Sequence, residues 1–303
     1  MLRKIWSNHP PLAATSLLMF AAFLFSVAGI LLDPRMITGA PAWLKPAKFG
    51  ISTALYTATL AWLFGYITVW PRFKRAMGLV IAAVVIVEVA IIDTQAARGT
   101  TSHFNVSTPL NAGLFAVMSG AILMLLLANI GILVALFRQK FTDPAWGWAL
   151  RLGLLITILG ASLGGLMTRP THAQVESLQR HEHVAAVGAH TVGAPDGGQG
   201  IPVLHWSSKH GDLRIPHFFG LHGIQIIPLF AWLIRRSAKG ADARRQTKKE
   251  LTDTSGGALD IAPVLRVFFK RRAVTGIFAF AGGYAGVVAL LTWQALAGRP
   301  LLG

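Results

Sequence analysis

Long apolar runs alternate with shorter polar segments along the whole chain. Each run holds about 20 residues, the length that an α-helix needs to cross roughly 30 Å of hydrocarbon. The pattern predicts an all-α fold: a single transmembrane domain over residues 1–303, built as a bundle of seven transmembrane helices. We expect these helices at residues 12–32, 47–69, 77–97, 110–137, 146–168, 216–234 and 274–296.

Two longer polar segments interrupt this pattern. Residues 169–215, before the sixth helix, are rich in glycine and proline and contain Trp206 and Val203 as apolar anchors. We therefore expect a folded lid there. Residues 235–273 are polar and basic, which is typical of a flexible loop at a membrane surface.

Basic residues gather in the loops after the second, fourth and sixth predicted helices. Such loops stay in the cytoplasm, so the pattern predicts a protein of the cell (inner) membrane with a cytoplasmic amino terminus. An odd number of crossings then places the carboxyl terminus and the 169–215 segment outside. The supporting residues are Arg72, Lys74, Arg75, Arg138 and Lys140, with the basic loop 235–273; Arg98, Arg169, Arg180 and Arg214 oppose the rule locally.

Composition agrees with a membrane protein and narrows its partners. The chain has 303 residues, is 53% hydrophobic and carries a net charge of +16. Because the basic residues flank apolar runs, we expect the lipid bilayer as a partner and no nucleic acid. The chain has no cysteine, which excludes disulfides, iron–sulfur clusters and thiol catalysis.

The predicted sixth helix begins within HGDLRIPHFFGLHGIQIIP, residues 210–228. Asp212 is a candidate helix cap, and Pro216 suits the first helical position. Histidines are concentrated here and in the outer loops, because all ten of them except His9 fall on the outer side of the predicted topology. This asymmetry indicates metal, haem or proton chemistry on that side.

The face of this helix carries three polar side chains. At about 100° per residue, His217, His222 and Gln225 lie within one arc of about 140°, which predicts the wall of a polar cavity. Gly220 and Gly223 flank His222 and would leave room for a bulky group.

The third predicted helix supplies acidic residues. Glu88 and Gln95 are seven residues apart and share a face, while Asp93 points elsewhere. A carboxylate in a bilayer costs about 2.5–3.5 kcal/mol on the insertion scale, so these groups should face partners or water. Arg98 and His103 follow at the outer end.

Two lysines open the second predicted helix. Lys45 and Lys48 lie at the positive end of its dipole, where an anion is expected to compensate them. Asp93 is one candidate for that anion, and a substrate carboxylate, phosphate or lipid headgroup is another.

These groups together predict a polar pocket in the outer halves of the helices. One hypothesis is a membrane enzyme that uses a zinc-like metal ion or a b-type haem and acts on a small-molecule or lipid substrate. Its metal ligands would be His103, His217 and His222, its catalytic residues Glu88, Asp93 and Arg98, and its substrate-binding residues Lys45, Lys48, Gln95, Asn105, Trp206, Asp212, Arg214 and Gln225.

A proton-coupled transporter or a membrane sensor without a cofactor is the alternative. The intramembrane acids favour it, whereas the scarcity of ionisable groups in the cytoplasmic halves of the helices disfavours a continuous transport path. The spacing of His217 and His222 is also poor for joint zinc ligation, which favours histidines four residues apart on a helix.

Pairs of glycines predict close helix packing at two places. Gly160 and Gly164 in the fifth helix, and Gly282 and Gly286 in the seventh, are each four residues apart. Small residues at this spacing allow two helices to approach closely.

Overall fold

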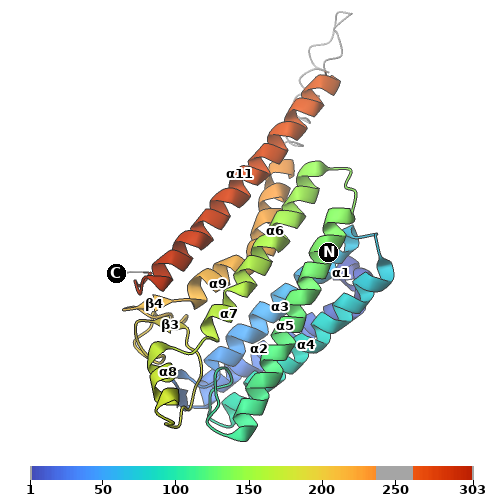
Figure 1. The fold of residues 1–303 in the computed structure, drawn as a ribbon. Helices are drawn as coiled ribbons and strands as arrows, with labels where there is room; N and C mark the ends of the chain where they lie inside the picture. Colours follow the sequence, from blue (N-terminus) through green and yellow to red (C-terminus); the bar gives the residue numbers. More distant parts are fainter. Residues whose placement is uncertain (1, 237–261, 302–303) are drawn as a thin grey trace, which may run out of the picture.

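The computed structural model describes residues 2–236 and 262–301, and shows an elongated bundle of helices (Figure 1). Prolines begin four of the long helices, where the missing N–H group leaves no hydrogen bond unmade. The helices are α1 Leu2–Asn8, α2 Pro10–Leu32, α3 Leu44–Leu63, the 3-10 turn η1 Phe64–Tyr66, α4 Pro71–Ala97, α5 Pro109–Arg138, α6 Pro144–Ser162, α7 Gly164–Met167, α8 His172–Gln179, α9 Arg214–Leu221 with the following segment Gly223–Arg236, and α11 Ala262–Leu296.

Two very short antiparallel sheets complete the described structure. In the first, β1 (Met36–Ile37) pairs with β2 (Ala40–Pro41) and links α2 to α3. In the second, β3 (Thr191–Val192) pairs with β4 (Gly211–Asp212) inside the segment before α9.

Five helices among the described residues are long and apolar enough to cross a membrane, namely α2, α4, α5, the run Pro144–Gln179 that contains α6, and Arg272–Leu296 within α11. The bent pair formed by α9 and Gly223–Arg236 makes up to six. The all-α membrane fold predicted from the sequence is therefore confirmed in outline. The predicted number of seven is not, because α3, which carries two lysines and several threonines, is not among these helices.

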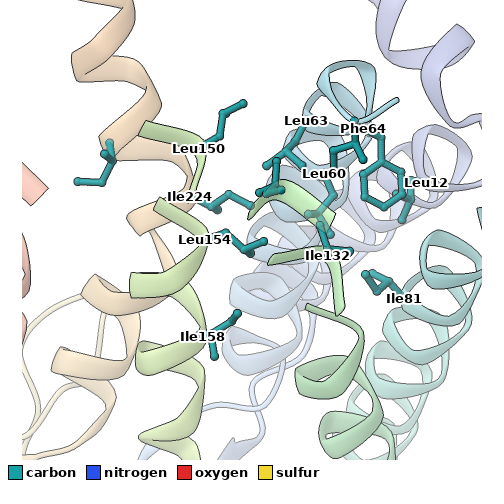
Figure 2. Packing of buried hydrophobic residues seen from close by; sticks show 14 of the residues in the cluster. Leu12, Leu60, Leu63, Phe64, Ile81, Ile132, Leu150, Leu154, Ile158 and Ile224 are labelled. Atoms are coloured by element: carbon teal, nitrogen blue, oxygen red, sulfur yellow. The ribbon is translucent and has the colours of Figure 1, made fainter. Parts of the chain in front are cut away.

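The helices form two groups that meet along α5 and α6. Within the first group, α2 packs along α3, and α4 packs against α5, α2 and α3; in the second, α6, α9 and α11 pack on one another. Figure 2 shows the apolar side chains between them, including Leu12, Leu60 and Phe64 in the first group and Leu154 and Ile224 in the second. Outward faces carry large exposed apolar side chains such as those of α2 and α5, as expected for contact with lipid.

Glycines bring α6 and α9 into backbone contact. A methyl group on Gly160 would lie 2.5 Å from Cα of Gly220, and one on Gly223 would lie 2.9 Å from the carbonyl oxygen of Gly153. Gly220 and Gly223 thus serve helix packing, and the predicted room for a bulky group beside His222 is wrong. Gly282 and Gly286 meet nothing within 4 Å in the described residues, so close packing predicted there is also wrong.

The predicted sixth helix is bent. α9 ends at Leu221, His222 lies at the break, and the next segment continues at 44°. α9 also begins two residues before Pro216. Asp212 is not its N-cap residue, but its carboxylate accepts from the N–H of Arg214, the first residue of the helix, at 3.0 Å. The calculation of one continuous polar face for His217, His222 and Gln225 therefore does not hold.

Residues 169–215, called the lid below, lie across one end of the bundle, called the lid end; the opposite end is the far end (Figure 1). The lid is hydrogen-bonded to the α4–α5 connection, with the N–H of Val187 donating to the carbonyl of Phe104 at 2.8 Å. Gly211 packs against the backbone of Ala295 near the end of α11. Trp206 is buried, whereas Val203 is 74% exposed and is not an anchor.

Candidate functional site

The main polar cluster of the lid end joins α3, α4 and the α4–α5 connection. Lys45 begins α3, and its Nζ lies 2.9 Å from Nδ1 of His103. The other ring nitrogen of His103 lies 3.3 Å from Oε1 of Glu88 on α4. Phe49 and Phe104 pack against the imidazole, with ring centroids 5.6 Å and 6.0 Å away. The cluster of Glu88, His103 and Lys45 is called the EHK cluster below.

Glu88 is an unusual member of this cluster. The residue is 2% exposed, and neither carboxylate oxygen has a hydrogen-bond partner among the described residues. The 3.3 Å separation from His103 is within ion-pair range, but its geometry is not that of a hydrogen bond. A buried polar group without a partner costs about 1–3 kcal/mol, so a structural role alone does not account for this residue.

His103 is held in its neutral form. Burial lowers the pKa of His103 well below its ordinary value, and the charge of Lys45 acts in the same direction, as do His217 and His190 more weakly. Because the ammonium of Lys45 can only donate, Nδ1 of the neutral ring accepts, and the ring proton is on the nitrogen that faces Glu88. In this tautomer the ring N–H faces the carboxyl group of Glu88, so Glu88 is the member of the pair that can take up a proton.

Two further histidines border the cluster. Nδ1 of His217 donates to the carbonyl oxygen of Gly160 at 2.8 Å, which fixes the imidazole between α9 and α6. Nδ1 of His190, in the lid, lies 3.0 Å from Oδ1 of Asp196. The pairing of His190 with Asp196 could not be predicted from the sequence, because it depends on the fold of the lid.

Three predicted site residues lie instead in hydrogen-bond networks that order the lid end, and a fourth packs there through its ring. Nε2 of Gln95 donates to Asn111 at 3.1 Å, and Nη1 of Arg98 donates to the same Asn111 oxygen at 3.2 Å. Oδ1 of Asn105 accepts hydrogen bonds from the backbone N–H and from the hydroxyl group of Ser107, and these bonds hold the α4–α5 connection. Trp206 packs on Phe218, with ring centroids 5.6 Å apart. Asn111, on the first turn of α5, was missed because one amide in an apolar run gives no pattern.

Lys48 ties the lid to the bundle, and Asp212 and Arg214 order the lid itself. Nζ of Lys48 donates to the carbonyl of Leu204 at 2.5 Å. Asp212 is fully buried, and its carboxylate accepts from the guanidinium of Arg214 at 2.6 Å and from the N–H of Ser207 at 2.7 Å. The ion pair between Lys48 and Asp93 that the sequence allowed does not form among the described residues. One oxygen of Asp93 is buried without a hydrogen-bond partner there.

His222 and Gln225 lie away from the EHK cluster. The ring of His222 packs on Phe218 at 4.4 Å between centroids. Gln225 donates from Nε2 to Oγ1 of Thr59 on α3 at 3.3 Å. These contacts place the two residues between the lid end and the interior of the bundle.

The predicted metal centre is not formed. Within residues 2–236 and 262–301, no group of three or more His, Asp or Glu side chains is arranged to hold a metal ion. His103 belongs to the EHK cluster, His217 borders it from a different element, and His222 lies at the helix break.

Comparison of the chain with models of protein families, with curated proteins and with solved structures finds no match. Its function is therefore argued from the geometry of the lid end.

Proposed function

We propose that this is a proton-coupled membrane protein, a transporter or a sensor, that works without a cofactor. In this proposal, α3 crosses the membrane together with the other helices to give seven crossings. The amino terminus is cytoplasmic, and the lid and carboxyl terminus face outside. The EHK cluster takes up and releases a proton on the outer side, under the lid, in response to a small solute or to pH.

The carboxyl group of Glu88 carries this proposal. It is buried without hydrogen-bond donors and lies 3.3 Å from an imidazole that is itself held neutral. Because the neutral ring already carries its proton on the nitrogen that faces Glu88, the carboxyl group takes up and releases the proton of this pair, and the charge of the cluster can change with little movement of atoms. Lys45 stabilises the anionic form of Glu88 through the intervening ring.

The arrangement of the histidines favours this proposal over the metal- or haem-dependent enzyme. His217 uses one ring nitrogen for a backbone carbonyl, and Gly220 and Gly223 are occupied by helix packing. The histidines, Glu88 and Asp93 do not come together in a group of three or more that could bind a metal ion. Proton exchange needs only the paired groups that are present.

Infrared difference spectroscopy tests the proposal. The purified protein in liposomes is stepped between about pH 8 and pH 5, a range in which imidazole and perturbed carboxyl groups titrate. We expect a carboxyl C=O band that is absent in Glu88→Gln and present in Asp93→Asn, the matched control on the same helix. His103→Ala should shift the midpoint of this band. A spectrum in which Glu88→Gln removes no band would overturn the proposal.

A further inference from the structure

One face of α3 is polar from Lys45 in its first turn to Thr59. At about 100° per residue, five side chains fall within an arc of about 80°. From the lid end inward they are Lys45, Lys48, Ser52, Tyr56 and Thr59. A spacing of three, four, four and three residues keeps them on one stripe, which is called the α3 stripe below.

The α3 stripe is not the packing face of this helix. Ala47, Gly50 and Ala54 on the other side are buried, and a methyl group on Gly50 would collide with the backbone of Phe23 in α2. The residues of the stripe are half-buried. They lie where the two groups of helices face one another, since α5 and the Gly223–Arg236 segment both reach them.

Polar side chains from both groups meet the stripe. Oη of Tyr56 lies 2.9 Å from Oδ1 of Asn129 on α5. Oγ1 of Thr59 accepts from Gln225 at 3.3 Å. A residue that served only to fill a helix interface would be apolar here, because polar interhelical pairs contribute about 1 kcal/mol or less in membranes.

Beyond Thr59, aromatic residues outside the stripe lie between it and the far end. Trp62 and Tyr66 follow Thr59 and pack on Trp146, with ring centroids 5.8 Å and 5.6 Å away. The guanidinium of Arg235 lies 5.0 Å above the ring of Trp146 and pairs with Asp143 at 3.1 Å. Charged groups therefore stand at both ends of this line of side chains.

Buried polar atoms along this line lack protein partners. They are Oε1 of Gln225 and Nε1 of Trp146, in addition to both oxygens of Glu88 at its start. Each needs a hydrogen bond to offset the cost of burial, and no described residue supplies one. Water is the partner that can reach acceptors and donors at three separate depths.

We infer that the α3 stripe lines a route for protons that connects the EHK cluster with the Arg235–Asp143 pair through side-chain hydroxyls and intervening water. Each hydroxyl or water accepts a proton on its oxygen and releases its own proton to the next acceptor, so no oxidant or reductant is needed. Along α3, Lys45 and Tyr56 are about 16 Å apart at 1.5 Å per residue, a distance that requires water between them. This inference rests on the proposed function and selects transport over sensing.

Proton flux into liposomes provides the test. The full-length protein is reconstituted with a pH-sensitive dye inside, and a pH gradient is imposed with potassium and valinomycin to clamp the potential. We expect the proton flux of the wild type to exceed that of protein-free liposomes. Tyr56→Phe should reduce the flux about tenfold, because it removes one hydroxyl group and keeps the aromatic ring. Tyr284→Phe is the matched control, because its hydroxyl donates to the carbonyl of Phe219 on α9, away from the stripe. Ser52→Ala is a second variant, with reduced flux expected.

The infrared band of Glu88 separates the two claims. If that band titrates in the wild type but the flux equals that of protein-free liposomes, the route is wrong and the EHK cluster remains as a sensor. If Tyr56→Phe and Ser52→Ala both carry wild-type flux, the route is also wrong. If flux falls in both variants while Tyr284→Phe and the Glu88 band are unchanged, the route is supported.

Discussion

Asp196 fastens the lid through a single carboxylate. It accepts hydrogen bonds from the backbone N–H of Thr191 at 2.9 Å and of His190 at 3.2 Å, and it pairs with the His190 ring. Burial is the largest influence on the pKa of Asp196 and raises it, but the hydrogen bond and charge of His190, with the bonds from Thr191, outweigh burial and hold the pKa at about 2. Its ionised form therefore stabilises the folded lid.

The pH dependence of the lid follows from this shift. Because the folded-state pKa of about 2 is below the ordinary value of 3.8, Asp196 contributes its full stabilisation above about pH 4, and this is lost as the pH falls toward 2. We expect Asp196→Asn to weaken the lid by about 1–2 kcal/mol at neutral pH. Hydrogen exchange of the lid amides measures it, with the exposed Glu182→Gln as control; equal protection in both variants would contradict the prediction.

Single residues also show where sequence reasoning reaches its limit. The cost of burying Glu88 and the position of His103 and Lys45 could be read from the chain, and the structure brings the three together. The partners of Gln95 and Arg98 could not be read, because both bond to Asn111, whose position depends on how α5 packs on α4.

At the scale of elements, the crossing of α6 and α9 depends on glycine at Gly160 and Gly220. Their backbones touch without side chains between them. The starts of α2, α5 and α6 were predicted to within two residues, and a proline marks each of them in the sequence. Other ends were not: α4 begins at residue 71 and not 77, and α11 begins at residue 262, inside the segment predicted as a loop. The break at His222 could not be predicted, because no proline marks it and it arises where α9 turns against α6.

Replacing one of these glycines should separate the two helices. Gly160→Ala places a methyl group 2.5 Å from the backbone of Gly220, and overpacking of this kind costs about 1–3 kcal/mol. Gly120→Ala is the control, because no atom of the described residues lies within 4 Å of that position in α5, and alanine is the better helix former. Thermal unfolding in detergent should show a lower Tm for the first variant only. An unchanged Tm for Gly160→Ala would mean that the crossing can relax.

At the scale of the whole molecule, the lid and the basic connections lie at opposite ends of the bundle. The lid covers one end, while Arg72 and Arg75 at the start of α4 and Lys140 between α5 and α6 belong to the other. This separation could be predicted from the charges of the loops alone. Because α-helices that run the full length of a bundle alternate in direction, every second loop lies at the same end.

Labelling of introduced cysteines tests the proposed orientation, and the chain has no cysteine of its own to interfere. We expect an impermeant thiol reagent to label His172→Cys, whose side chain is 92% exposed on α8, in intact cells. Lys140→Cys, on an exposed residue of the other end, should react only after permeabilisation. The reverse pattern would place the lid in the cytoplasm and remove the outer site.

The contact between Gly211 and Ala295 has a consequence for the making of the protein. The chain is synthesised from its amino terminus, so Glu88, His103 and the lid all exist before α11 is inserted. The lid can reach its final position only when the end of α11 arrives to support β4. We therefore expect Glu88 to stay open to water until α11 is inserted, which spares the nascent chain the cost of an unpartnered acid. In this order of assembly, the arrival of the last helix is the step that lets the lid close over the lid end.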